Sequence, residues 1–596
     1  MATYSRPGVY IQEVALPQTV TPADFSSAVG AFAGSLPQGI TTAPVLVSGW
    51  TEFTKNFGGL NDSYPTTWAA YNFFANGGRQ LYVKRVVGSS SAVGTLTVSD
   101  SAGGTTTLTA TVTAASATGG VVTYTANNNF SVGQTVSITG LSTAAFNLTN
   151  VVIATRSATQ FTVTNAATGT AVTGASATAT VTVTITINPV FTVNAINAGT
   201  WSSDYSVQIS PAGTVSRFAL TVYQSVIVNG QGSSVPVESY TDLSMDSTDK
   251  NFVRTVINTY SKYINIPSAG FDATKTPYTA ATSPTALAGG SNGGTPGRTD
   301  YATAWTTFDS INNPLVIYAP DAAYAATSTL CTQIHGDAVS YAANRVMNDG
   351  FAIIDTPSGL GVSAAQDQIT ATKAVFAGDT AGGEVAAYYP WVNIPDPTKV
   401  VGATRLQAPG AAMAGQFLAT DASRGPAKTP AGLNNVIALA VSTEHSFTNA
   451  ELDAINTSTS PINAIRNVPG AGIVAMGGRT LDNTPNNRYI NIRRSLIYIE
   501  KNLNDLTSFA VFENNDSRLW LRLRTVLNAF LLSYWQSGGL RGTNPGQAYY
   551  VKCDSTTTSF ADIQNGRVNI EVGVALQYPA EFVVIKIGQL TGNASA

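Results

Sequence analysis

The chain contains few charged residues. Lysine, arginine, aspartate and glutamate make up 11% of its 596 residues, whereas an average soluble protein has roughly 25%. The net charge is −3, and no segment gathers the lysines and arginines that bind a polyanion. These properties argue against direct binding to nucleic acid. They also predict a surface covered mostly by small and neutral polar side chains.

Cysteine and histidine are also scarce, with two residues of each type. Cys331 and Cys553 cannot form a disulfide framework for a chain of this length, which indicates folding in a reducing compartment. Cys331 and His335 share one face of a predicted helix, but a zinc site needs three or four ligands and no others are in place. Neither His335 nor His445 lies near the Gly-x-Ser-x-Gly motif of a nucleophilic serine. The sequence therefore predicts no metal, no cofactor and no enzymatic activity.

Asp355 stands where α/β folds often bind ligands. It follows the predicted strand Phe351–Ile354 and precedes the glycine-containing loop 356–361. The glycines of this loop do not match the phosphate-binding or dinucleotide-binding patterns, and Pro357 interrupts the approach to the next helix. A cap at the end of the strand is the favoured interpretation.

Long apolar runs are missing as well. The nearest candidate, Val526–Trp535, is interrupted by Asn528 and Ser533 and is shorter than the roughly 18 apolar residues of a membrane helix. Residues 1–7 lack the apolar core of a secretory signal. We therefore expect a soluble protein that is made in a cytoplasm and does not insert into a membrane.

The length of the chain predicts about three to five domains. Alternating strand and helix signals predict an α/β body over 21–88 and 190–440, with parallel strands in Pro314–Asp355. Between these parts, 89–189 is rich in Thr, Val, Ala and Gly, and its Thr-Val alternation favours strands. We interpret this insert as an antiparallel β-sandwich, with a disordered linker as the alternative. The predicted class is a multidomain α/β and α+β protein with mixed sheets.

Residues 441–577 contain the strongest helix signal, Ser517–Gln536, in which apolar residues recur with the period of one buried face. Arginines and acidic residues alternate in and before this helix. A surface of mixed sign suits ion pairs between subunits better than nucleic acid, and a solvated face is the alternative. The candidate interface charges are Arg493, Arg494, Arg518, Arg522 and Glu513.

Both ends of the chain carry strand-like segments. The strand near the C-terminus is apolar on both faces, so it needs cover from a sheet. We interpret 1–20 and 578–596 as arms that exchange strands between chains. The candidate arm residues are Val9, Tyr10, Ile11, Phe582, Val583, Val584, Ile585 and Ile587.

Short motifs follow one another in order along nearly the whole chain outside 89–189. They include Arg6-Pro7-Gly8-Val9-Tyr10, Phe73-Phe74-Ala75-Asn76-Gly77-Gly78, Tyr388-Tyr389-Pro390-Trp391, Lys428-Thr429-Pro430-Ala431-Gly432, Gly478-Arg479-Thr480-Leu481, Ile492-Arg493-Arg494-Ser495-Leu496, Phe512-Glu513-Asn514-Asn515 and Pro579-Ala580-Glu581-Phe582. Each motif alone is a weak signal, but their order and coverage are specific. On these motifs the chain resembles the sheath proteins of contractile bacteriophage tails, which are related to pyocin and type VI secretion sheaths.

The resemblance implies a subunit that polymerises as stacked hexameric rings around an inner tube, with arms that add strands to sheets of neighbouring subunits. It implies contraction that drives the tube through the host envelope after the baseplate triggers it. The implied partners are further copies of the chain, the tail tube protein, and baseplate and tail terminator proteins. The implied location is the tail sheath of a virion assembled in the bacterial cytoplasm. The insert 89–189 is expected on the outer surface, and 441–577 is expected to face the tube.

Two other functions agree less well with the sequence. A cell-surface or S-layer-like self-assembling adhesion protein would need an export signal that residues 1–7 do not show. An α/β hydrolase with a β-sandwich appendage would need a histidine in a catalytic setting. The leading hypothesis is therefore a structural sheath subunit.

Overall fold

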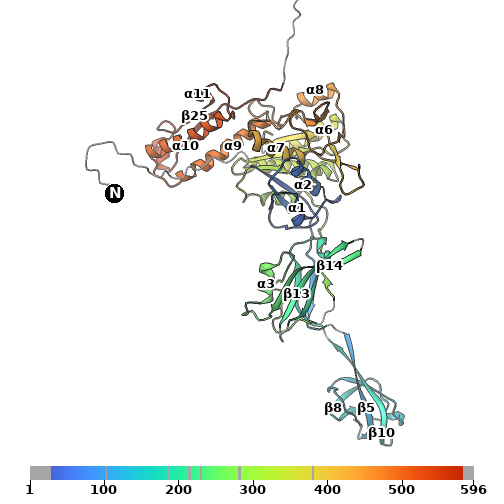
Figure 1. Ribbon diagram of the computed structural model, residues 1–596. Helices are drawn as coiled ribbons and strands as arrows, with labels where there is room; N and C mark the ends of the chain where they lie inside the picture. The colour runs from blue at the N-terminus through green and yellow to red at the C-terminus, as the bar shows by residue number, and fades with distance from the viewer. Residues whose placement is uncertain are drawn as a thin grey trace, which may run out of the picture. The chain divides into compact units, whose positions relative to one another are not determined.

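The chain forms two compact units (Figure 1). Unit 2 is the continuous stretch Ala92–Ser291, and unit 1 is formed by the chain on both sides of it, so unit 2 is an insertion in unit 1. The computed structural model describes residues 28–101, 104–185, 187–212, 217–228, 231–279, 283–378 and 382–581.

Unit 1 is built on an eight-stranded, mostly parallel sheet with the order β2-β3-β1-β17-β18-β19-β23-β24. The strands from β3 to β23 are parallel to their neighbours, whereas the edge strands β2 and β24 are antiparallel. The parallel pairing predicted for Pro314–Asp355 is confirmed by β17 and β18. The strands are β1 (Val29–Ser35), β2 (Val45–Val47), β3 (Leu81–Val86), β17 (Leu315–Tyr318), β18 (Gly350–Asp355), β19 (Val385–Tyr389), β23 (Asn463–Val468) and β24 (Gly472–Ala475).

Helices cover both faces of this sheet because its central strands are apolar on both sides. Phe32 and Ile353 point into a core shared with α1, α2 and α7, whereas Ala31 and Ile354 point into a core shared with α4, α5 and α6. Successive residues of a strand thus serve opposite cores. The helices are α1 (Trp50–Phe57), α2 (Pro65–Ala75), α4 (Arg298–Thr306), α5 (Ser328–Asn344), α6 (Val362–Phe376) and α7 (Gly410–Arg424).

Helices α2 and α7 pack very closely. A Cβ added at Gly415 of α7 would lie 2.4 Å from the carbonyl oxygen of Phe73 in α2, so only glycine fits at this crossing. Helix α2 ends at Ala75, and Gly77 just beyond it has a φ of 90°, while the Gly78 N–H donates to the Phe73 carbonyl at 3.0 Å. This is a glycine C-cap, since the left-handed conformation carries no Cβ penalty in glycine.

Smaller elements complete this part of unit 1. Helix α8 (Asn449–Thr457) begins with a capping box: the Glu451 N–H donates to the Thr448 hydroxyl at 3.3 Å, and the Thr448 N–H donates to the Glu451 carboxylate at 2.8 Å. A three-stranded antiparallel sheet lies between β19 and α8 in the chain. Its strands are β20 (Val392–Pro395), β21 (Thr404–Gln407) and β22 (Ser442–Thr443).

Unit 2 contains two small antiparallel sheets and helix α3 (Val253–Tyr260) around one apolar core. Phe191, Leu220 and Val253 are buried in this core. The sheets have the orders β15-β11-β4 and β14-β13-β12-β16. Their strands are β4 (Thr95–Ser99), β11 (Pro189–Ala195), β12 (Tyr205–Pro211), β13 (Phe218–Val228), β14 (Gln231–Leu243), β15 (Ile264–Asn265) and β16 (Thr285–Ala286).

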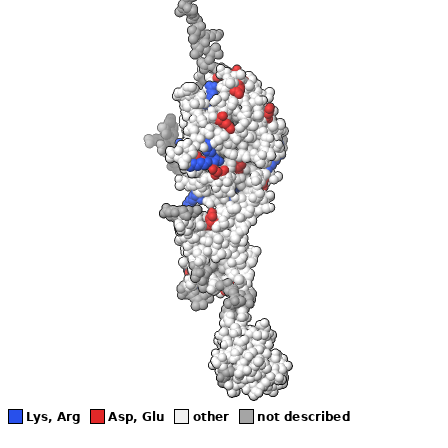
Figure 2. All heavy atoms as spheres, turned by 90° about the vertical axis from the view of Figure 1, so that its right-hand side faces the viewer, with Lys and Arg blue, Asp and Glu red and all other residues white. Residues whose placement is uncertain are grey.

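The remainder of unit 2 is a closed antiparallel barrel with the strand order β10-β5-β6-β9-β8-β7. Tyr124, Phe130, Phe146 and Phe161 are fully buried inside it. Arg156 is the one charged residue within 104–185, and the face of the barrel seen at the foot of Figure 2 shows no charge. The strands are β5 (Gly104–Thr118), β6 (Val121–Thr125), β7 (Thr135–Thr139), β8 (Val151–Arg156), β9 (Gln160–Thr164) and β10 (Val172–Ile185).

The barrel corrects the β-sandwich predicted for 89–189. Strand β10 pairs with β5 along one edge and with β7 along the other, so the sheet closes on itself and does not form two packed layers. Closure removes free sheet edges. Many proteins place charged side chains on such edges to prevent edge-to-edge pairing with another chain. This segment has almost no charged side chains, so closure of the barrel prevents such pairing instead.

Candidate inter-subunit site

The C-terminal part of unit 1 is a helical hairpin with a small sheet beside it (Figure 1). Helix α9 (Ile490–Thr507) and helix α10 (Ser517–Gln536) pack together through Tyr498, Phe530 and Tyr534. The Asp516 side chain caps α10 by accepting the N–H groups of residues 518 and 519, each at 2.9 Å. The predicted helix Ser517–Gln536 and its buried face are both confirmed.

A two-stranded sheet lies against this hairpin. Strand β25 (Tyr549–Lys552) follows α11 (Pro545–Ala548), and β26 (Glu571–Val574) follows α12 (Phe560–Gln564). The strands are antiparallel, with residue 549 opposite 574 and residue 552 opposite 571. Tyr549, Val551, Val572 and Val574 face the apolar cluster of α10.

The other face of the sheet is open to solvent. Tyr550 is 52% exposed, and its hydroxyl donates to the Glu571 carboxylate at 2.8 Å. Its ring lies over Gly573, where an added Cβ would be 2.1 Å from a ring carbon. Among the described residues, neither β25 nor β26 has a second strand neighbour. Each strand therefore presents a free edge of backbone N–H and C=O groups, which is the feature that accepts an added strand.

After β26 the chain continues along the body of unit 1. Leu576 bridges to Leu540, and the Gln577 side chain donates to the Leu540 carbonyl at 3.0 Å. Asn491 of α9 donates to the Gln577 carbonyl at 2.8 Å. The chain reaches Glu581, the last described residue, where the carboxylate meets Arg479 at 2.6 and 2.7 Å.

The predicted arm residues lie outside the described part of the chain. This applies to Val9, Tyr10 and Ile11 and to Phe582, Val583, Val584, Ile585 and Ile587. Strand exchange by these residues stays a prediction. What the structure describes is the segment that leads to the C-terminal arm and a small sheet with free edges.

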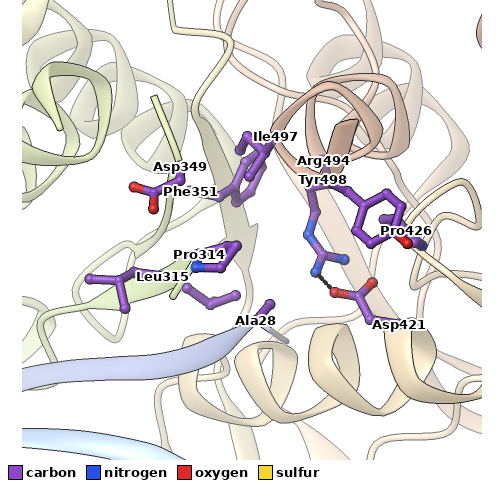
Figure 3. A pocket seen from close by; sticks show the side chains of 11 residues that line it. Ala28, Pro314, Leu315, Asp349, Phe351, Asp421, Pro426, Arg494, Ile497 and Tyr498 are labelled. Carbon is purple, nitrogen blue, oxygen red and sulfur yellow. Dashed lines mark hydrogen bonds and ion pairs between the residues drawn. The ribbon is translucent and has the colours of Figure 1, made fainter. Parts of the chain in front are cut away.

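The five candidate interface charges occupy different environments. Arg494 is buried and forms an ion pair with Asp421 of α7 beside a small cavity of about 30 Å³ (Figure 3). Arg493 pairs with Glu384 and Glu500 and keeps 12% of its side chain exposed. Arg518, Arg522 and Glu513 are exposed on the hairpin, and Arg522 lies over the Phe509 ring at 4.1 Å. Arg494 is therefore part of the core, whereas these last three residues lie on the surface.

Sequence reasoning missed the pairing of Arg479 with Glu581. Both residues lie in motifs that carried the resemblance, but 102 positions separate them. No local pattern links residues at such a separation. Around Arg479 the sequence shows only a loop of apolar and polar residues that contains an arginine. Such a loop does not identify the carboxylate that the arginine binds.

Cys331 and His335 are both fully buried in α5, with the sulfur 3.6 Å from Nδ1 of the histidine. Burial lowers the pKa of His335 to about 3, so the imidazole is neutral. Within the described ranges, no three His, Cys, Asp or Glu residues gather as a metal site. The pair is thus an internal contact of a helix that packs against the sheet.

Asp355 is also fully buried. Its Oδ2 accepts the Tyr318 hydroxyl at 2.7 Å and the Gly410 N–H at 3.0 Å, so it joins the end of β18 to the start of α7. This arrangement agrees with the predicted strand-end cap. Burial raises the pKa of the carboxyl to about 7, and the two hydrogen bonds oppose the increase.

The raised pKa of Asp355 predicts that the stability of the protein depends on pH. Because folded Asp355 keeps its proton up to about pH 7 while an unfolded aspartate loses it near pH 4, its stabilising contribution is complete below pH 4 and is lost as pH rises through 7. We expect the free energy of unfolding of the wild type to fall by on the order of 2–3 kcal/mol relative to Asp355→Asn between pH 5 and 8. Urea unfolding at both pH values measures this. A difference between the two proteins that does not change with pH would contradict the prediction.

Residues 482–589, which contain the hairpin, the small sheet and the exit segment, match the family model "Phage tail sheath C-terminal domain". The match covers this C-terminal region and not the rest of the chain. The resemblance to contractile tail sheath proteins is thereby confirmed, and the matched region contains the two-stranded sheet β25–β26. No curated protein matches the chain.

Solved structures show the same fold. The contracted helical sheath of the anti-feeding prophage has 17% identity and a TM-score of 0.51, with 98% of this chain and 100% of that chain covered. A sheath tail protein from Listeria innocua has 11% identity and a TM-score of 0.53, with 92% and 95% covered. One from Desulfitobacterium hafniense has 11% identity and a TM-score of 0.50, with 91% and 93% covered.

None of the helices described in this chain combines the length and apolarity needed to cross a bilayer.

Proposed function

We propose that the chain is the structural subunit of a contractile tail sheath, which polymerises as stacked hexameric rings around a tail tube. The observation that carries the proposal is the two-stranded sheet β25–β26, whose strands have no further strand neighbour among the described residues, inside the region that matches the sheath C-terminal domain. A strand from a neighbouring subunit on such an edge makes a heterologous contact, which repeats along an axis without closing.

The terminal arms supply the added strands in this proposal. Of the arms predicted at 1–20 and 578–596, residues 578–581 lie against the subunit's own body, so residues 1–20 and 582–596 are the parts that reach neighbouring subunits and hold the polymer together while the subunit bodies move during contraction. The apolar alternation of residues 582–587 suits a strand that is covered on both faces. Contraction then rearranges the contacts between bodies and drives the tube through the host envelope, with no bound nucleotide required.

The other parts of the chain have places in the same scheme. The barrel within 89–189 faces outward, because a compact domain at that place would obstruct packing of the body against the tube, and 441–577 faces the tube. Arg518, Arg522 and Glu513 lie exposed on the hairpin and form ion pairs with adjacent subunits or the tube. The further partners are baseplate and tail terminator proteins, and the site of action is the virion tail after assembly in the bacterial cytoplasm.

Negative-stain microscopy of the purified full chain tests this function. We expect hollow tubes with a regular axial repeat at high protein concentration. Because exposed ion pairs are screened by salt, the lowest concentration that gives tubes is expected to rise between 50 mM and 500 mM NaCl. Uniformly monomeric particles at every concentration and both salt levels would contradict the proposal.

A further inference from the structure

The segment that leads to the C-terminal arm is held by hydrogen bonds at its two ends, and between them residues 578–580 form no hydrogen bond with the described part of the chain. At one end, Asn491 and Leu540 hydrogen-bond Gln577. Between Tyr578 and Glu581 the chain borders a cavity of about 450 Å³, whose other walls are the loops 427–432 and 476–478 together with Asn456, Tyr489 and Asn491. The only ring contact of this stretch with the body is the edge of Tyr578 against Tyr489, with ring centroids 6.2 Å apart, among the residues that the structure describes.

At the far end, Glu581 is bound by a fork of donors. Arg479 Nε and Nη2 donate to the two oxygens of its carboxylate at 2.7 and 2.6 Å, and the Tyr489 hydroxyl donates at 3.2 Å. The side chains of Arg479 and Glu581 are 14% and 19% exposed. A bidentate pair that is largely shielded from water is among the stronger and more directional contacts of a carboxylate.

The body side of this contact is itself fixed. The Arg479 N–H donates to Asn463 at 2.8 Å, and Asn463 donates back to the Arg479 carbonyl at 2.8 Å. Asn463 begins β23 and is 1% exposed. Arg479 Nη1 also donates to the Asn456 carbonyl of α8 at 2.5 Å. The guanidinium is therefore aimed at Glu581 by the central sheet and by a helix.

We propose that Arg479 and Glu581 form a clasp that fixes the point at which the C-terminal arm leaves the subunit, and that assembly depends on this clasp. Arg479 is a positioning residue, since it acts through Glu581 on residues that follow. Without the clasp the next hold on the chain is at Gln577, four residues earlier. The free arm would then gain up to about 14 Å of reach and lose its direction. The part of this inference that concerns assembly rests on the proposed function.

Mobility of a spin label in the unassembled full chain tests the clasp directly. A nitroxide label on Ala580→Cys is suitable, because Ala580 is exposed and Cys331 and Cys553 are buried. We expect the label to tumble at least threefold faster in Arg479→Gln and in Glu581→Gln than in the otherwise unchanged labelled chain. Because each residue acts through the other, the double variant should tumble no faster than either single variant. Arg479→Lys, which keeps the charge but loses the fork, should be intermediate. Arg488→Gln is the matched control, since Arg488 donates to Asn483 and not to the exit segment, and its label mobility should equal that of the labelled chain without further substitution.

Assembly of the same variants tests the consequence. The lowest concentration that gives tubes should be at least tenfold higher in both single variants, with unchanged melting temperature, and unchanged in Arg488→Gln. Unchanged label mobility in the single variants, additive effects in the double variant, or a more mobile label with normal tubes would each overturn the clasp. If the wild type forms no tubes, the proposed function fails, and the spin-label experiment alone decides whether Arg479 holds the segment.

Discussion

Replacing Arg494 by methionine is expected to lower the free energy of unfolding of the chain by about 3–5 kcal/mol. The side chains of Arg494 and Asp421 are 5% and 2% exposed, and their ion pair joins α9 to α7 (Figure 3). Arg494 also lies over the Phe417 ring at 4.7 Å. Methionine fills much of the same volume but leaves the Asp421 carboxylate buried without its cation, and such a charge is costly.

The loss of stability in Arg494→Met should increase with pH. Burial already raises the pKa of Asp421 to about 6, and Arg494 keeps it from rising further. Without the arginine this pKa rises, so the folded variant holds a proton that the unfolded chain releases, and stability falls as pH increases. We therefore expect a larger loss at pH 8 than at pH 5. Urea unfolding followed by tryptophan fluorescence measures the loss of stability. The signal reports mainly on unit 1, because Trp201 is the one tryptophan of seven that lies in unit 2.

Two further variants make this prediction specific. Adding Asp421→Asn to Arg494→Met removes the stranded charge and should recover more than half of the loss. Arg518→Met is the matched control, since Arg518 is exposed and surface substitutions usually change stability by less than about 0.5 kcal/mol. A loss below about 1 kcal/mol in Arg494→Met would show that the pair is not an important part of the core.

Local patterns account for the parts of the fold that the sequence predicts well. The periodicity of α10, the capping box of α8 and the apolar run of β18 each arise from neighbouring residues, so each is visible in the chain itself. Strand β1 was missed, because the glycines and alanines of Val29–Ser35 have no strand preference of their own. Its burial between β3 and β17 decides its conformation.

Features that depend on distant residues were not predictable in the same way. The Thr-rich insert has the strands that were expected, but only the pairing of β10 with β7 decides between a barrel and a sandwich. Arg494 has the charge and helical setting of an interface residue, and its partner Asp421 lies 73 positions away. The sheath resemblance identified the right region, since its motifs include the loop of Arg479 and the segment of Glu581. It did not show that these two motifs meet.

Deleting residues 582–596 is expected to abolish polymerisation and to leave the subunit folded. The deleted stretch begins after Glu581, so every contact between described residues is kept. In the proposed polymer, a strand added along the four residues of β26 makes about four backbone hydrogen bonds worth about 1 kcal/mol each. Their loss weakens each contact by about 4 kcal/mol, or roughly 1000-fold in the association constant. Removal of residues 1–16 is expected to act in the same direction through the N-terminal arm.

Pelleting assays and negative-stain images measure the loss, and a melting curve within about 2 °C of the wild type shows that the body is intact. A variant that keeps the full length but carries Gly and Ser at 582–587 separates the strand pattern from chain length. It should fail like the deletion, because the alternation of Phe582 and Val584 with Val583, Ile585 and Ile587 is what covers both faces of an added strand. Tubes formed by either variant at the wild-type concentration would mean that the subunit bodies alone carry the polymer and that the free edges of β25 and β26 have another role.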